Sequence, residues 1–138
     1  MRGFLFLILI VFAFLLSNCK SNKAESDAFI NSGVAKDNSQ DYYGAMTDYN
    51  KAIELNPNSS LAYYDRGTMK LNKLHDYRGA IVDFDKAIEI DPNYAVAYGN
   101  RGAAKFNLND KNSACLDFSK AGELGFMGAY DYIKKYCK

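Results

Sequence analysis

The side chains that could do chemistry in this sequence are a single histidine, three cysteines and a recurring aspartate. His75 stands alone, and no serine or cysteine has a spacing that identifies a nucleophile, a base and an orienting acid. The spacing of His75, Cys115 and Cys137 also matches no usual set of metal ligands. The sequence therefore predicts no catalytic site and no metal site, and it indicates no cofactor.

The recurring carboxylates are Asp48, Asp83 and Asp117, which follow one another at intervals of 35 and 34 residues. Recurrence at one structural position favours a solvated or a helix-pairing role over an acid–base pair. Both of these roles remain open at this point.

Cys115 and Cys137 could form a disulfide. If the helix that holds Cys115 turns near Gly125 into a final helix, the two cysteines lie on antiparallel partners at nearly the same height. In an oxidising compartment, a bridge that closes a loop of this size would stabilise the C-terminal end by about 3 kcal/mol. Two buried free thiols are the alternative.

The third cysteine, Cys19, follows an apolar N-terminal segment. Arg2 precedes an uninterrupted apolar run from Phe4 to Leu16. As a helix this run would span about 20 Å, which is short of the ~30 Å hydrocarbon core of a membrane. It predicts a secretory signal peptide over residues 1–18, with an uncleaved anchor as the alternative.

The stretch from Leu16 to Cys19 resembles the lipobox of bacterial lipoproteins, in which cleavage precedes a cysteine that then carries lipids. It departs from the usual form at Asn18, where Gly, Ala or Ser is typical. The resemblance implies lipidation at Cys19, for example with palmitate, followed by a polar tether, so that residues 19–26 form the anchor region. A plain signal peptide with an incidental cysteine is the alternative.

Composition excludes one class of partner. The 17 Lys and Arg residues nearly balance the 16 Asp and Glu residues, so the chain lacks the basic excess that nucleic-acid phosphates require. The length of 138 residues and the 49% hydrophobic content suit a single folded domain.

The elements that position these side chains come from an internal repeat. The phrases "TDYNKAIEL", "VDFDKAIEI" and "LDFSKAGEL" follow one another at intervals of 35 and 34 residues. In each copy a glycine and two alanines let two antiparallel helices approach, and an aromatic residue one turn after the first alanine fills the space. These residues are Gly33, Ala45, Tyr49 and Ala52, then Gly67, Ala80, Phe84 and Ala87, and then Gly102, Ala114, Phe118 and Ala121.

Helix boundaries follow from the same copies. Pro57 and Pro92 should end the second helix of the first two copies, and the one extra residue of the second copy is placed in the turn within "KLNKLHDY". Asn58 or Ser59, and Asn93, are candidate helix caps. We expect helices at 25–37, 41–55, 60–73, 76–90, 94–107, 110–123 and 128–136.

This pattern resembles the tetratricopeptide repeat, a helix-turn-helix unit of about 34 residues. The resemblance implies an all-α fold, a helical-hairpin solenoid of three tetratricopeptide repeats with a C-terminal capping helix. The repeat domain is expected at 27–138, with repeats at about 26–59, 60–94 and 95–128 and the capping helix at 128–137. One hairpin cannot bury its apolar face alone, whereas stacked copies share a continuous core.

The resemblance also implies where a partner binds. In the family, the first helix of each unit lines a concave groove that takes a protein or peptide. The matching positions here are Ile30, Val34, Leu61, Tyr64, Thr68, Leu71, Val96 and Phe106, with Gly99 and Ala103 beside them. Several of them could instead be core between repeats. Family members that clamp a C-terminal carboxylate use Lys and Asn in the first helix, where this chain has Ile30 and Val34, so we expect no such clamp.

The sequence thus predicts a non-catalytic scaffold for protein–protein interaction, with a protein or peptide partner and no small-molecule substrate. We expect a lipid-anchored lipoprotein that faces the periplasm and is held in the outer membrane, with the inner membrane left open. Lys20, the residue after Cys19, is not the aspartate that retains many lipoproteins in the inner membrane. By resemblance, it would assist the assembly of an envelope complex. An accessory or substrate-delivery subunit of a periplasmic enzyme is the alternative.

Overall fold

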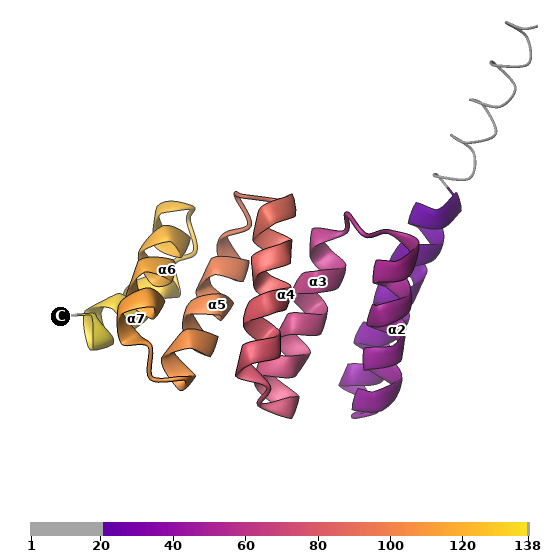
Figure 1. Ribbon diagram of the computed structural model, residues 1–138, viewed down its shortest axis with the longest axis horizontal. Coiled ribbons are helices and arrows are strands. Elements are labelled where there is room, and N and C mark those ends of the chain that lie inside the picture. Colours follow the sequence, from indigo (N-terminus) through magenta and orange to yellow (C-terminus); the bar gives the residue numbers. More distant parts are fainter. Residues whose placement is uncertain (1–20, 138) are drawn as a thin grey trace, which may run out of the picture.

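The computed structural model describes residues 21–137, which form a row of antiparallel helices (Figure 1). An N-terminal helix is described over residues 21–38. The elements that follow are α2 (Tyr42–Leu55), α3 (Ser60–Met69), the π-helical segment η1 (Lys70–Leu74), α4 (Tyr77–Ile90), α5 (Ala95–Asn107), α6 (Lys111–Glu123) and α7 (Ala129–Tyr136). The all-α fold is confirmed. The predicted signal peptide and Cys19 lie outside the described residues.

The helices pair in chain order along the long axis of the molecule, as Figure 1 shows. The N-terminal helix with α2, α3 with α4, and α5 with α6 form three units, and α7 packs on α6. We call the N-terminal helix, α3 and α5 the first helices of the units, and α2, α4 and α6 the second helices. This arrangement is the solenoid with a capping helix that the sequence predicts.

The glycines and aromatic residues of the repeat pack as the spacing predicts. A Cβ atom added at Gly67 would lie 2.9 Å from Cε1 of Phe84, closer than real side chains approach. The other two units show the same contact, at 2.6 Å between Gly33 and Tyr49 and at 2.9 Å between Gly102 and Phe118. The glycines therefore let the aromatic ring of each second helix lie directly against the backbone of the first.

Aspartates cap the N-termini of the second helices. The Oδ1 atoms of Asp41 and Asp76 accept hydrogen bonds from the amides of Gly44 and Gly79, both at 2.9 Å, and Asp110 accepts one from Ser113 at 3.2 Å. These bonds satisfy amides that lack a partner within the helix.

Two candidate caps of the first helices have different outcomes. Ser59 caps α3, as predicted, through a 3.3 Å bond from the amide of Ala62. The expectation for Asn93 is wrong, because α5 follows Tyr94 without a side-chain cap.

The extra residue of the second unit is absorbed by η1. The carbonyl of Lys70 accepts a 2.9 Å hydrogen bond from Asp76, six residues later, whereas the corresponding bonds from Asp41 to Lys36 and from Asp110 to Lys105 span five. In all three units the residue before the aspartate has a positive φ, and in the second unit this residue is His75, at 53°. A π-helical turn thus takes up the insertion at the end of the first helix and leaves the reversal itself unchanged.

The N-terminal helix starts earlier than the predicted residue 25. Residues 21–26, which were expected to form part of the polar tether, are helical. Ser26 is buried, and its hydroxyl donates a 2.8 Å hydrogen bond to the carbonyl of Ala52 in α2. Within residues 21–137, none of the helices has both the length and the apolar character needed to cross a membrane.

Candidate partner-binding face

Exposure separates the predicted partner-binding residues into core and surface. Val34 and Leu61 are 41% and 46% exposed. Ile30 is buried against Ala52 and Ala62, so it belongs to the core. The partner-binding prediction therefore needs correction at Ile30, because the neighbouring unit covers it.

Leu71 needs the same correction. It is buried in a cluster with Ala80, Phe84 and Ala104, which come from its own unit and the next one. The remaining predicted residues are exposed or half-buried, and we call them the first-helix face: Val34, Leu61, Tyr64, Thr68, Val96 and Phe106.

Asn100 joins two units at this face. Its Nδ2 atom donates hydrogen bonds to the hydroxyl of Tyr64 at 3.2 Å and to the hydroxyl of Thr68 at 3.3 Å. The Tyr64 ring also packs on Tyr94, with centroids 4.9 Å apart, and on Phe84 at 6.0 Å. Tyr64 is therefore half-buried and connects the second unit to the third. No local spacing in the sequence marks Asn100, because its partners lie 32 and 36 residues away in the preceding unit.

Two carboxylates, Asp37 and Asp65, interact between the first two units near the first-helix face. Burial, together with the negative charge of Asp37, raises the pKa of Asp65 to about 6. Burial is the main cause that raises the pKa of Tyr49, and the negative charges of Asp65, Asp37 and Asp48 raise it further. The Oδ1 atom of Asp37 is buried and has no hydrogen-bond partner among the described residues.

The recurring aspartates pair the helices of each unit and are buried, so the solvated role is excluded for them. Asp83 is bound by Arg66 through two hydrogen bonds, of 3.0 and 2.6 Å, and by Lys70 at 2.7 Å. Asp117 is bound in the same way by Arg101, at 2.9 and 2.6 Å, and by Lys105 at 2.7 Å.

The first unit uses a different pair of donors. Ser32 donates to Asp48 at 2.6 Å, and Lys36 lies 2.7 Å from the same carboxylate. Burial alone would raise the pKa of Asp48, but the hydrogen bonds from Lys36 and Ser32 and the charge of Lys36 hold it below its usual value.

The two arginines also connect consecutive units. The Nη1 atom of Arg66 donates to Asn50 of α2 at 2.7 Å, and that of Arg101 donates to Asp85 of α4 at 2.6 Å. Each arginine on a first helix therefore joins the second helix of its own unit to that of the preceding unit. The first unit, which has no preceding unit among the described residues, carries Ser32 at this position.

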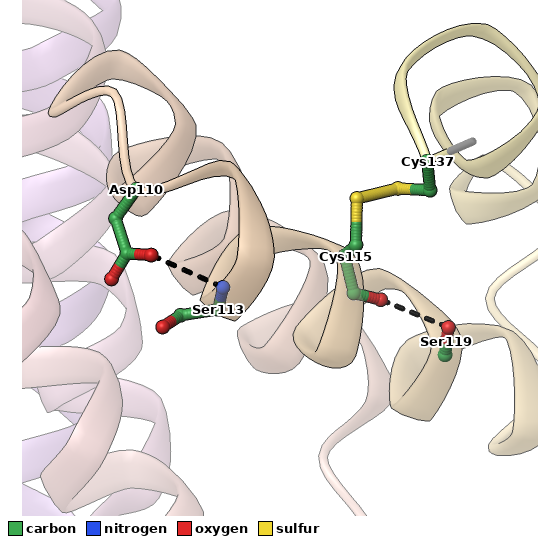
Figure 2. Close-up of a disulfide and its surroundings, with 5 residues drawn as sticks. All are labelled: Asp110, Ser113, Cys115, Ser119 and Cys137. Carbon is green, nitrogen blue, oxygen red and sulfur yellow. Dashed lines mark hydrogen bonds between the residues drawn. A yellow bond between two sulfur atoms is a disulfide. The ribbon is translucent and has the colours of Figure 1, made fainter.

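Among residues 21–137, the histidine and both cysteines make contacts with other side chains. Nδ1 of His75 lies 3.5 Å from the hydroxyl of Tyr77. Cys115 and Cys137 are joined by a disulfide, the pairing that the sequence suggested (Figure 2). Over residues 21–137, no three His, Cys, Asp or Glu side chains gather as metal ligands.

Family models match three stretches of the sequence. Residues 26–59 and 48–81 match models described as "Tetratricopeptide repeat", and residues 70–109 match one described as "TPR repeat". Together the matches span residues 26–109, more than half of the 138 residues. The chain belongs to the tetratricopeptide repeat (TPR) family.

Solved TPR domains share the fold of this TPR chain. The Arabidopsis OM64 TPR domain is 28% identical, with a TM-score of 0.76, and the match covers 83% of this chain and 98% of that one. The first TPR of Spaghetti (RPAP3), solved with the HSP90 peptide SRMEEVD, is 22% identical, with a TM-score of 0.79 and coverages of 83% and 92%.

A third structure is the second TPR domain of human RPAP3 in complex with the HSP70 peptide SGPTIEEVD. It is 24% identical, with a TM-score of 0.76 and coverages of 87% and 98%. A comparison with curated protein sequences finds no significant match.

Proposed function

We propose that this TPR chain is a protein-binding scaffold whose first-helix face takes a segment of a protein partner. The exposure of Val34 and Leu61 carries the proposal, because they remain uncovered on the first helices while Ile30 and Leu71 are covered by neighbouring units. Solved TPR domains with the same fold hold peptides, which supports a peptide segment as the ligand.

The charge near the first-helix face determines which kind of partner segment can bind there. The peptides in the RPAP3 structures, SRMEEVD and SGPTIEEVD, end in acidic residues. This chain instead has the apolar side chain of Val34 on its first-helix face and the carboxylates of Asp37 and Asp65 nearby. An acidic tail would be repelled there, because like charges at close range are unfavourable. We therefore expect a partner segment that is apolar with neutral or basic side chains.

The cell envelope is the proposed location, with a lipid on Cys19 as the anchor and assistance to an envelope complex as the role. The lipobox-like stretch before Cys19 motivates the anchor. The Cys115–Cys137 bridge supports a compartment such as the bacterial periplasm, since disulfides persist in oxidising environments.

The test compares two pairs of exposed apolar residues. Val34→Asp and Leu61→Asp change the first-helix face, whereas Val82→Asp and Leu116→Asp change the second helices, where the side chains are 65% and 72% exposed. Each full-length variant carries the same affinity tag, and partners are captured by cross-linking in intact cells and quantified by mass spectrometry. The first pair should lose at least about tenfold of the specific capture, and the second pair should keep it. All four should melt near the wild-type temperature, because exposed substitutions change stability little. Equal capture by all four variants would reject the face.

A further inference from the structure

Helix α7 depends on α6 for its stability. It has eight residues, and Ala129 is the one that is fully buried. An isolated helix of this length is not stable in water. The structure therefore keeps α7 helical through its contacts with the terminal unit.

The noncovalent contacts of α7 come from one side of the helix. Ala129 belongs to the hydrophobic cluster of α6, and Ile133 packs against that cluster. Tyr132 stacks on Phe118 with centroids 4.8 Å apart, and Tyr136 packs on Phe106 at 4.6 Å. The hydroxyl of Tyr130 donates a long bond of 3.4 Å to the carbonyl of Gly122. All three tyrosines of α7 remain exposed on their other side.

The two ends of the disulfide differ in how firmly they are held. Cys115 lies in α6, whose first turn is capped by Asp110, and its carbonyl accepts a 2.9 Å bond from the hydroxyl of Ser119 (Figure 2). Cys137 follows the last residue of α7. Gly125, between α6 and α7, has a φ of 94° and open space around its Cβ position, so it suits a hinge. Once the bridge is open, α7 is the part free to move.

The disulfide is accessible to an attacking thiol. Both cysteines are half-buried, and they line a surface pocket of about 520 Å³ together with Lys111, Leu116 and Tyr136. Lys111 precedes Cys115 by four residues on α6, which puts the two on one helix face. A nearby ammonium group stabilises a thiolate, and a stabilised thiolate leaves faster in thiol–disulfide exchange.

We propose that the Cys115–Cys137 bridge is a thiol–disulfide exchange site at which an external dithiol, carried by a protein or a small molecule, releases α7. One thiolate of the dithiol attacks the sulfur of Cys137 and forms a mixed disulfide, and Cys115 leaves as a thiolate. The second thiolate of the dithiol then attacks the dithiol's first sulfur, which is bonded to Cys137 in the mixed disulfide, and Cys137 leaves as a thiolate. The dithiol is oxidised to a disulfide, and two electrons and two protons end on the cysteines.

Release of α7 changes the surface of the terminal unit. Phe118 loses the stacked ring of Tyr132, and Phe106 loses Tyr136. Phe106 belongs to the first-helix face, so reduction would enlarge that face at its C-terminal end. This consequence rests on the proposed function, whereas the exchange site and the release of α7 do not.

The test needs no partner, so its failure is distinct from failure of the first-helix face. The full-length protein in detergent is incubated with dithiothreitol without denaturant, and free thiols are counted by alkylation and intact mass. Amide hydrogen exchange is then measured in both redox states. We expect reduction within minutes and roughly 100-fold faster exchange in residues 129–137, as the chain-entropy model gives for a loop of this size. Exchange over 42–107 should be unchanged.

Two variants complete the experiment. Cys115→Ser/Cys137→Ser should reproduce the fast exchange of α7 without reductant, and Lys111→Gln should slow reduction severalfold while leaving exchange in the oxidised protein unchanged. A bridge that resists native reduction, or an α7 that is equally protected after reduction, overturns the proposal. Unchanged reduction of the Lys111→Gln variant overturns the assigned role of Lys111.

Discussion

The guanidinium of Arg66 donates two parallel hydrogen bonds to the carboxylate of Asp83, of 3.0 and 2.6 Å. The carboxylate is almost fully buried, and the same arginine reaches back to Asn50 of the preceding unit. This pair therefore links stability within one unit to the contact between units.

A double-mutant cycle should show coupling at this pair. Arg66→Met leaves Asp83 with Lys70 as its remaining cation, and we expect a loss of about 1.5–3 kcal/mol, the range for hydrogen bonds to charged groups. Arg66→Met/Asp83→Leu should cost less than the sum of the two single changes, because Arg66 and Asp83 are in direct contact and each single change already removes the same two hydrogen bonds. Urea denaturation of the four proteins measures the coupling, and additive losses would contradict it.

The glycine contact at Phe84 gives a second prediction. Gly67→Ala would put a methyl group 2.9 Å from the ring, so we expect a loss of about 1–3 kcal/mol, although alanine favours helices. Gly122→Ala is the matched control, because its nearest neighbour is 3.4 Å away and the change should be neutral or slightly stabilising. Thermal melts compare the two, and equal melting temperatures would count against tight packing at Gly67.

Asp65 should make stability depend on pH. Its pKa in the folded chain is raised to about 6 from 3.8, so the folded state takes up a proton before the unfolded state does. Stability at this site should therefore rise as the pH falls from about 7 to 4. Asp65→Asn should stabilise the protein by about 1 kcal/mol at pH 7.5, allowing for solvent screening, and by almost nothing at pH 4. Melting curves of both proteins across this range test the sign, and a constant difference would contradict it.

Deleting one residue from η1 should be tolerated. The first and third units close the same reversal with five-residue spacing, from Lys36 to Asp41 and from Lys105 to Asp110, whereas the second uses six. A chain without Lys73 should replace the π-helical turn with an ordinary helix end and keep its free energy of unfolding within about 1 kcal/mol. Deleting Lys105, which pairs with Asp117, is the destabilising control. Equal losses would mean that the π-helical turn is required.

Lipidation at Cys19 is tested in cells. Radiolabelled palmitate should enter the wild-type protein and the Cys115→Ser/Cys137→Ser variant, and it should not enter Cys19→Ser. Equal labelling of Cys19→Ser would rule out the anchor at this position.

Local spacing predicts much of the fold, because its determinants lie within one unit. The contact between Gly67 and Phe84 follows from small and aromatic residues placed at helical intervals, and the pairing of Cys115 with Cys137 follows from their distances to the turn at Gly125. Both depend on a single helical hairpin.

Contacts between units were not predictable in the same way. The sequence places Ile30 and Val34 on one face of a helix, and only the stacking of the second unit decides that Ile30 is covered while Val34 is exposed. The hydrogen bond from Asn100 to Tyr64 spans 36 residues and depends on the angle between consecutive units. The same angle brings Asp37 close enough to Asp65 to raise its pKa.

The helical state of residue 21 limits the reach of an anchored molecule. This residue lies two positions after Cys19 and already belongs to the N-terminal helix, which continues to residue 38. Two residues of extended chain span at most about 7 Å. A chain acylated at Cys19 would therefore hold its first unit against the lipid headgroups, because the link between the lipid and the helix is too short to let the unit move away from the bilayer. Its partners would have to present their binding segment close to the membrane surface.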